Sequence, residues 1–141
     1  MLISSKGRYG LKAMYLIAIK DSPLSVKQMA QTERLSEQYL EQLIATLKRD
    51  NLIFSKRGAK GGYILAKKPE EITVGDILRS LEGDFMSVDC ISGECDYEDC
   101  STKQIWHKIH SGINSVLDSY TLQDMIDGNK IIRNSESEIR N

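Results

Sequence analysis

The sequence has no long apolar run. Its longest uninterrupted apolar stretch, residues 13–19, is far shorter than the ~20 residues that a membrane-spanning helix needs. The first residues also lack the charged, apolar and small-residue regions of a secretory signal. Hydrophobic content of 40% and charged content of 28% are those of an ordinary globular protein. We therefore expect a cytoplasmic protein with no membrane partner.

The fingerprints of an enzyme are missing as well. No nucleophile lies beside a base, no pair of carboxylates marks a cleft, and no cofactor motif is present. The glycine-rich stretch at 58–62 lacks the Gly-Lys-Ser/Thr ending of a phosphate-binding loop, and it leads into a strand-like run instead of a helix. We therefore expect that the protein is not an enzyme.

Cysteine is scarce, and all three cysteines lie within residues 90–100, a run with no Lys or Arg. An odd count without a secretory signal argues against a disulfide framework. Thiolates bind iron, zinc or an iron–sulfur cluster well, so Cys90, Cys95 and Cys100 predict one metal centre. They supply one ligand too few for a closed tetrahedral site. Idle or redox-sensitive thiols and a structural zinc site are the alternatives.

Charge is distributed unevenly along the chain. The formal net charge is −1, but residues 1–68 carry 13 Lys and Arg against 5 Asp and Glu, whereas residues 69–141 carry 6 against 15. A basic half joined to an acidic half indicates that the first part faces a polyanion. The second part is expected to do something else.

Hydrophobic periodicity predicts three helices in the basic half, over residues 7–20, 26–32 and 36–50. Ser25 and Ser36 are candidate N-caps, and Leu35 is placed to staple the start of the third helix. The apolar stripe of the first helix is predicted to consist of Leu11, Met14, Tyr15 and Ala18. That of the third consists of Leu40, Leu43, Ile44 and Leu47. A short helix, a tight turn and a longer helix with a polar outer face form a helix-turn-helix.

A β-hairpin follows, with strand-like runs at 52–54 and 63–65 joined by a basic, glycine-rich tip. Further helices are predicted over 73–81, ending at Gly83, over 102–120, and over 121–126. The long helix has an apolar stripe that a small domain cannot cover, which indicates pairing with a second chain. The alternative is that it folds back onto its own domain. Its stripe contains Ile105, Ile109, Ile113, Val116 and Tyr120.

These elements predict a mainly α fold with a small β-hairpin, a winged helix-turn-helix domain plus a long C-terminal dimerisation helix. The expected division is a DNA-binding domain at 1–83, a cysteine-bearing cluster-binding loop at 84–101, the dimerisation helix and a short terminal helix at 102–127, and a disordered tail at 128–141.

A winged helix-turn-helix with a basic surface predicts binding to double-stranded DNA. Gln38 and Gln42 can bond base edges in the major groove, Glu41 can accept from cytosine, and Arg57 suits a narrow minor groove. Lysines on the same surface would contact phosphates and make binding depend on salt. The expected contact residues are Lys6, Arg8, Lys27, Ser36, Gln38, Tyr39, Glu41, Gln42, Arg57 and Lys60, with Lys12 and Lys56 as further phosphate contacts.

The sequence resembles the Rrf2 family of bacterial winged-helix transcription regulators. The resemblance rests on MLISSKGRYGL at 1–11, LSEQYLEQL at 35–43, RGAKGGY at 57–63 and ITVGDI at 72–77, and it covers about residues 1–127. The three cysteines, followed by Thr102, Trp106 and Leu122, are similar to the IscR-like subgroup of iron–sulfur cluster regulators. The resemblance implies a homodimeric repressor of iron–sulfur cluster biogenesis genes that binds palindromic promoter DNA. It also implies a 2Fe–2S cluster held by the three cysteines, with a 4Fe–4S cluster as the alternative.

The chain departs from the subgroup at the fourth cluster ligand. Relatives that use histidine place it where this chain has Lys103, and others use an acidic residue where this chain has Arg8. The remaining candidates are His107, His110, Asp99, Ser101 or an exogenous thiol, of which His107 is the weak first choice. Two other functions stay open. One is a CymR-like repressor of cysteine metabolism controlled by a protein partner, and the other is an NsrR-like nitric-oxide sensor.

Overall fold

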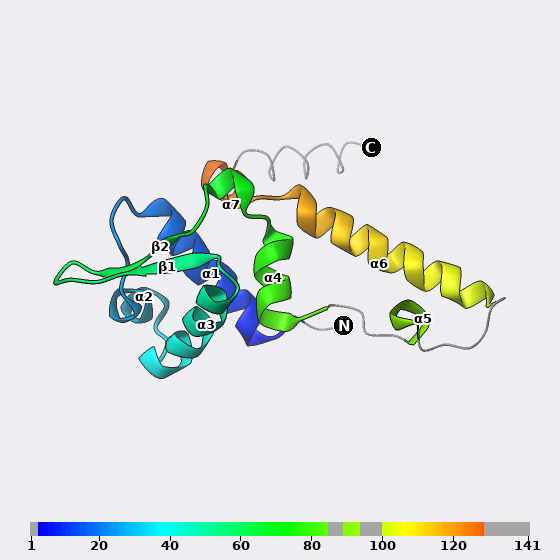
Figure 1. The fold of residues 1–141 in the computed structure, drawn as a ribbon, viewed down its shortest axis with the longest axis horizontal. Coiled ribbons are helices and arrows are strands. Elements are labelled where there is room, and N and C mark those ends of the chain that lie inside the picture. Colours follow the sequence, from blue (N-terminus) through cyan, green and yellow to red (C-terminus); the bar gives the residue numbers. More distant parts are fainter. Residues whose placement is uncertain (1–2, 85–88, 94–99, 129–141) are drawn as a thin grey trace.

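The computed structural model describes residues 3–84, 89–93 and 100–128. The predicted fold class is confirmed, because the described chain is mainly helical with one two-stranded antiparallel hairpin (Figure 1). The predicted disordered tail falls almost entirely outside these residues. The elements are α1 (Ser5–Ile19), α2 (Val26–Glu33), α3 (Glu37–Arg49), β1 (Ile53–Lys56), β2 (Gly62–Leu65), a 3-10 turn η1 (Pro69–Glu71), α4 (Val74–Glu82), α5 (Asp89–Ser92), α6 (Ser101–Ser119) and α7 (Leu122–Asp127).

The helix boundaries follow local signals that were readable in the sequence. Ser25 and Ser36 accept hydrogen bonds from the backbone of the first turns of α2 and α3, as expected for N-caps. The turn between them places Arg34 in the left-handed region at φ 54°, which ends α2 within one residue. Gly83, at φ 78°, ends α4. The predicted helix-turn-helix is therefore formed by α2 and α3.

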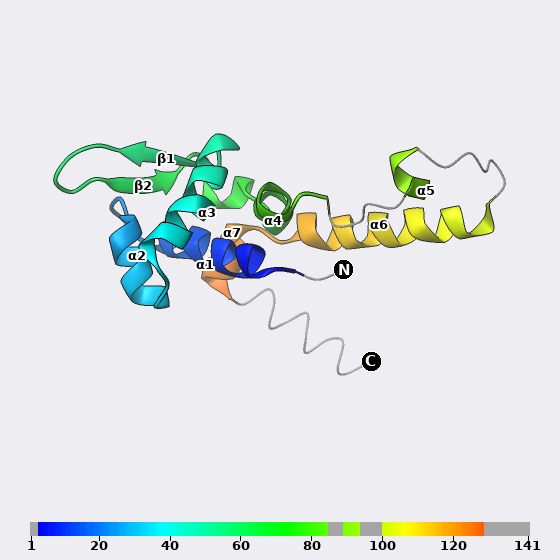
Figure 2. The same cartoon turned by 90° about the horizontal axis from the view of Figure 1, so that it is seen from below.

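One core holds the helix-turn-helix and the wing together with α1, α4 and α7. The stripe predicted for α3 is confirmed, since Leu40, Leu43, Ile44 and Leu47 are all buried. These side chains pack with residues from α1, α2, β1, α4 and α7. Figure 2 shows these elements gathered around α3 from a second direction. The largest fully buried side chains are Met14, Met29, Leu40, Ile44, Leu47, Ile53, Ile72, Ile77 and Leu122.

The stripe predicted for the first helix is only partly confirmed, since Met14 is buried and Leu11 and Ala18 pack against the core while remaining partly exposed. Alpha-1 buries Gly7, Gly10, Ala13, Met14 and Ile17, so its small residues face the interior. The reason is the close approach of α4, because a side chain at Gly10 would collide with Leu81. Almost every position from 11 to 19 is apolar, so periodicity alone does not identify the buried face.

The hairpin forms as predicted, with Ile53 opposite Leu65 and Lys56 opposite Gly62. An additional bridge joins β2, close to the wing tip, to the connection between α1 and α2. The Leu24 N–H donates to the Tyr63 carbonyl at 3.1 Å, and the Tyr63 N–H donates to the Leu24 carbonyl at 2.8 Å. Gly62 permits this approach, since a Cβ there would meet the Leu24 backbone. The wing is thereby fixed to the helical body at the last strand pairs before its tip.

Helix α6 extends away from the body, with α5 beside its far end (Figures 1 and 2). None of its residues is buried, and Ile105, Ile109 and Val116 of the predicted stripe are exposed, so the chain's own domain leaves much of that stripe uncovered. The chain then returns to the core. The Val74 N–H donates to the Tyr120 carbonyl at 2.8 Å, the Leu122 N–H donates to the Ile72 carbonyl at 2.9 Å, and Leu122 is fully buried. The end of α6 is therefore attached to the body by backbone hydrogen bonds.

None of the helices in the described part of the chain is both long and apolar enough to cross a membrane.

Candidate nucleic-acid interface and cysteine segment

The outer face of α3 carries the side chains predicted to read bases. Gln38, Glu41 and Gln42 are all exposed, because the opposite face of the helix supplies the core. They recur at positions i, i+3 and i+4, so they lie on one side of the helix. Two amides and a carboxylate on one exposed helical face can donate to and accept from the edges of base pairs.

Ser36 and Tyr39 have structural partners at the start of the same helix. The Ser36 Oγ accepts from the Tyr39 N–H at 3.1 Å and thereby caps α3. The Tyr39 ring meets Tyr9 edge-on with centroids 6.2 Å apart, and its hydroxyl donates to the Ser5 Oγ at 3.1 Å. These contacts connect α3 to α1, so both residues position the outer face of α3 in addition to any contact with DNA.

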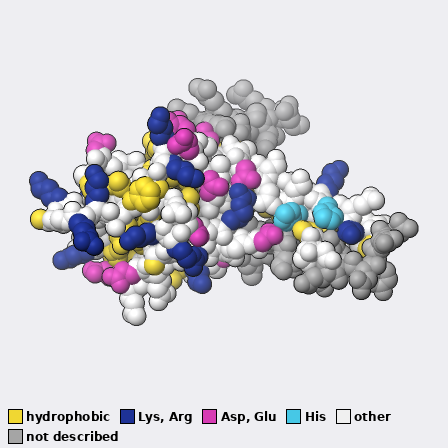
Figure 3. All heavy atoms as spheres, viewed as in Figure 1, with side chains coloured by type: hydrophobic (Ala, Val, Ile, Leu, Met, Phe, Trp, Pro, Cys, Tyr) yellow, Lys and Arg dark blue, Asp and Glu magenta, His cyan; other side chains and the backbone are white. Residues whose placement is uncertain are grey.

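The expected phosphate-contacting residues lie on three different elements. Lys6 and Arg8 are exposed in the first turns of α1, Lys27 is exposed on α2, and Arg57 and Lys60 are exposed at the tip of the wing. Figure 3 shows Lys and Arg side chains gathered over the half of the molecule that contains these elements. The charge asymmetry of the sequence is thus also an asymmetry in space, and it provides a cationic surface around α3.

The start of α1 depends on a residue that the sequence patterns did not single out, Glu82 at the end of α4. Its Oε1 accepts from the Ser4 N–H at 2.9 Å, the Ser4 hydroxyl at 2.6 Å and the Gly7 N–H at 2.9 Å. Burial raises the pKa of the Glu82 carboxyl, but these donors and the charge of Lys6 outweigh burial and hold the pKa below its ordinary value. The only available signal was Ser4, a residue of the type that caps helices.

Cys100 is the one cysteine whose side chain the structure describes. It is the N-cap of α6, is partly exposed, and its Sγ lies 2.9 Å from the Thr102 Oγ1. The Thr102 hydroxyl, followed by the backbone N–H groups of Lys103 and Thr102, lowers the pKa of the Cys100 thiol. A lowered pKa favours the thiolate, which is the form that binds metals and reacts with oxidants. The backbone of Cys90 belongs to α5, but its side chain, like all of Cys95, lies outside the described residues.

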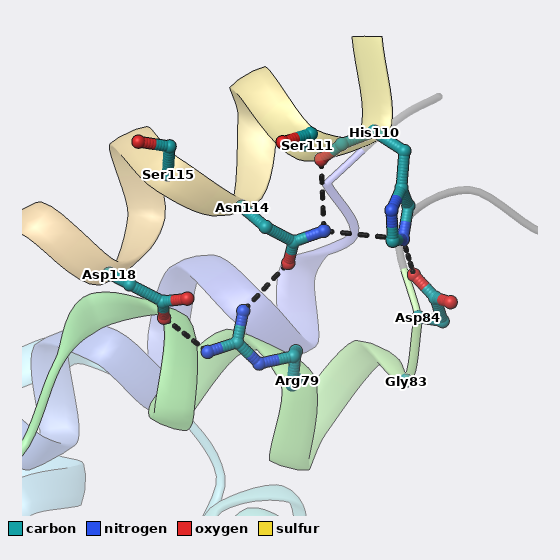
Figure 4. Close-up of a pocket in the computed structure, with 8 residues that line it drawn as sticks. All are labelled: Arg79, Gly83, Asp84, His110, Ser111, Asn114, Ser115 and Asp118. Carbon is teal, nitrogen blue, oxygen red and sulfur yellow. Dashed lines mark hydrogen bonds and ion pairs between the residues drawn. The ribbon is translucent and has the colours of Figure 1, made fainter. Parts of the chain in front are cut away.

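The candidates for a fourth metal ligand are spread along α6. His107 is exposed, and a helical rise of 1.5 Å per residue puts it about 10 Å along the axis from Cys100. His110 lies farther along and contacts the Asp84 carboxylate at 3.2 Å (Figure 4). Ser101 begins α6, and Asp99 is outside the described residues. Within the described ranges, no three His, Cys, Asp or Glu side chains come together in a group that could hold a metal ion.

Comparison with known proteins places this arrangement in a family. A sequence model of the Rrf2 family, described as an iron-dependent transcriptional regulator, matches residues 3–128. The transcriptional regulator CymR of Bacillus subtilis is 45% identical over 127 residues, which cover 89% of each chain. IscR of Yersinia enterocolitica is 32% identical over 136 residues, covering 94% of this chain and 83% of the relative.

Solved structures agree with the sequence matches. The structure of CymR, the global cysteine regulator of B. subtilis, superposes with a TM-score of 0.77 at 41% identity, covering 92% of this chain and 98% of the other. The structure of T. potens IscR superposes with a TM-score of 0.75 at 44% identity, covering 91% and 88%. These relatives are transcriptional regulators and not enzymes, and the winged helix-turn-helix is a DNA-binding fold. The chain belongs to the Rrf2 family of DNA-binding transcriptional regulators.

Proposed function

We propose that the protein is a homodimeric repressor that binds palindromic promoter DNA through α3 and the wing. The observation that carries the proposal is the division of α3 into a buried apolar stripe and an exposed face with Gln38, Glu41 and Gln42. In this proposal the exposed face enters the major groove and reads base edges. Arg57 enters the adjacent minor groove, while Lys6, Arg8, Lys27 and Lys60 contact phosphates.

We infer that a second copy of the chain covers the apolar face of α6. Ile105 is 59% exposed, Ile109 40% and Val116 59%, and Trp106 adds a further 39%-exposed apolar side chain. A row of large exposed apolar residues along one helix marks an interface. A second copy fits this face because the same row on two antiparallel helices is complementary to itself. Two recognition helices would then face two half-sites of a palindrome.

We further propose that the segment with Cys90, Cys95 and Cys100 holds an iron–sulfur cluster, of the 2Fe–2S type, and that the regulated genes serve iron–sulfur cluster biogenesis. The proposal is supported by the spacing of the thiols, by the lowered pKa of Cys100 and by the similarity to IscR proteins. When bound, the cluster would make the protein responsive to iron and oxidants. The chain's own contribution is positional, since the segment joins α4 of the DNA-binding body to α6.

The cluster proposal is tested by purifying the protein without oxygen. We expect a coloured protein with visible absorption, and about two irons and two sulfides per chain, the content of a 2Fe–2S cluster. Replacing any one of the three cysteines with Ala should remove the absorption and change the affinity for promoter DNA, measured by fluorescence anisotropy. A colourless protein containing zinc, or three variants with unchanged binding curves, would contradict the proposal.

A second candidate is a CymR-like repressor of cysteine metabolism, which is favoured by the 45% identity to B. subtilis CymR. In this case the protein would contain no iron, and a protein partner or oxidation of Cys100 would change its affinity for DNA. The discriminating measurement is the anisotropy titration of metal-free protein with and without a thiol oxidant. A strong oxidant effect in colourless protein would favour the second candidate over the first.

A further inference from the structure

A ladder of polar side chains joins α4 to α6. The Arg79 Nη1 donates to the Asn114 Oδ1 at 2.7 Å, and its Nη2 pairs with the Asp118 carboxylate (Figure 4). The Asn114 amide donates to the His110 carbonyl at 3.0 Å, and the His110 Nε2 bonds Asp84 Oδ1 at 3.2 Å. We call Arg79, Asp84, His110, Asn114 and Asp118 the α4–α6 ladder.

The ladder is built for a close approach of the two helices. A Cβ on Gly75 would meet both the Asp118 carboxylate and the Arg79 guanidinium, so a larger residue there would displace this pair of side chains. The Thr73 hydroxyl, next to the start of α4, donates to the same carboxylate oxygen at 3.4 Å. Asp118 therefore binds two donors from α4 and its N-cap. The separation of the helices at this point is fixed by these contacts.

The ladder also determines which way α6 is turned about its axis. His110, Asn114 and Asp118 are spaced by four residues and line one face of the helix. Ile105, Ile109 and Val116 lie about 150° away around the helix at 3.6 residues per turn. The polar face binds α4 while the apolar face points away from the body. A change in the ladder would consequently turn the apolar face to a new direction.

Stability is not the main contribution of these contacts. The Arg79 side chain is 34% exposed and that of Asp118 is 46% exposed. Ion pairs at this level of exposure contribute little to the free energy of folding, because water screens them. The end of α6 is held by the backbone bonds of Tyr120 and Leu122, and the ladder extends the attachment by nearly three helical turns, to His110. Without it, α6 would be free to pivot about residue 120.

We propose that Arg79 is a positioning residue that sets the spacing between the two DNA half-sites recognised by the dimer. The inference rests on the proposed dimeric, DNA-binding function. Arg79 determines the direction in which the apolar face of α6 points. That direction determines where the second chain binds. The position of the second chain in turn determines the distance between the two α3 helices. Half-sites must match this distance to about one helical turn of DNA or a multiple of it. Arg79 thereby acts on operator geometry without contacting DNA.

The experiment compares wild-type protein with Arg79→Ala by selection from random DNA, which yields the half-site sequence and the half-site spacing together. We expect the variant to retain the half-site sequence but to lose the single preferred spacing. Its affinity for the wild-type operator should fall about tenfold, which is the scale of coupling between distant sites in one protein. Lys108→Ala, which removes a charge from an exposed position of α6 outside the ladder, is the matched control and should behave as wild type.

Two further variants keep the test decisive. Arg79→Lys keeps the charge but cannot bind Asn114 and Asp118 together, so its spacing preference should be intermediate. Asn114→Ala removes one rung while leaving the Arg79–Asp118 pair, and it replaces Arg79→Ala if that variant fails to fold. Folding is checked by thermal unfolding and dimer mass by sedimentation.

The outcomes separate the inference from the proposed function. Folded, dimeric Arg79 and Asn114 variants with the wild-type spacing and affinity would overturn the inference alone. A wild-type protein that selects no palindrome would overturn the proposed function and the inference with it.

Discussion

At the scale of single residues, Glu82 compensates for an unusual helix start. Alpha-1 has no acidic residue in its first turn and carries Lys6 and Arg8 near its N-terminus, where the helix dipole is positive. The negative charge comes instead from the end of α4. Gly7 is part of the same arrangement, since a Cβ there would lie 2.7 Å from the Glu82 Oε1. Lys6 and Arg8, which are expected to contact DNA, therefore lie at a helix start that is held by a carboxylate 75 positions away from Gly7.

We expect Glu82→Gln to destabilise the fold at neutral pH by on the order of 1 kcal/mol, a modest value because water screens the partly exposed carboxylate. The folded pKa of Glu82 lies below its ordinary value of 4.5. The ionised group therefore stabilises the fold above that value, and this contribution is lost as the pH falls through the folded pKa. Urea unfolding between pH 3 and 7, roughly spanning the carboxylate range, should show a shallower pH dependence in the variant than in wild type.

The matched control is Glu70→Gln, an exposed glutamate in η1. Its pH profile should follow that of wild type. A Glu82 variant whose stability changes with pH as steeply as wild type would show that the Ser4 and Gly7 contacts do not favour the ionised form.

At the scale of elements, α3 and the wing divide the work of recognition. Side chains on α3 face base edges in the proposed complex, whereas the wing tip brings Arg57 and Lys60 to the backbone and minor groove. Base contacts provide sequence discrimination, and phosphate contacts provide affinity that depends on salt. The two elements therefore predict two different signatures on mutation.

Gln42→Ala should lose about 1–3 kcal/mol of discrimination at one base pair while leaving the salt dependence of binding unchanged.

Lys60→Ala should weaken binding to all sequences and reduce the slope of log affinity against log salt by about 1. Anisotropy titrations over a range of KCl concentrations, on the operator and on single-base variants, measure both quantities. Lys108→Ala serves as a charge-matched control. If Lys60→Ala leaves the slope intact, the wing tip does not contact phosphate.

The comparison of α3 with α1 shows what periodicity can and cannot predict. Alpha-3 alternates clearly between apolar and polar faces, so its buried residues were predicted correctly. Alpha-1 is apolar on most sides, and its buried face was selected by its neighbours. Gly10 is buried because Leu81 needs the space, which no local pattern in α1 encodes.

At the scale of the whole molecule, α6 carries most of the large exposed apolar side chains that the structure describes, namely Ile105, Trp106, Ile109 and Val116. We expect Ile109→Asp to yield a folded monomer, because a charge buried in an apolar interface costs several kcal/mol. The matched control, Gln104→Asp, introduces the same charge at an exposed position of α6 away from the apolar face. Sedimentation measures the mass. A dimeric Ile109→Asp variant would place the interface elsewhere.

Only part of the candidate site could be predicted from the sequence. The cysteines, the exposed face of α3 and the basic wing were visible because chemistry and spacing coincide within short stretches. The α4–α6 ladder was not predicted, because Arg79 and Asp118 are ordinary polar residues until the fold places them in contact across 39 positions. Long-range polar pairs carry no local signature, since any exposed helix position accepts an Arg or an Asp.

The length of α6 relates motion at its two ends. A helix of 19 residues is about 28 Å long, and Cys100 lies at the end farthest from the body. A rotation of about 10° at the base moves the far end by about 5 Å over this length. A displacement of several ångströms at the thiol end of α6 therefore corresponds to only a small change in the angle between α6 and the DNA-binding body.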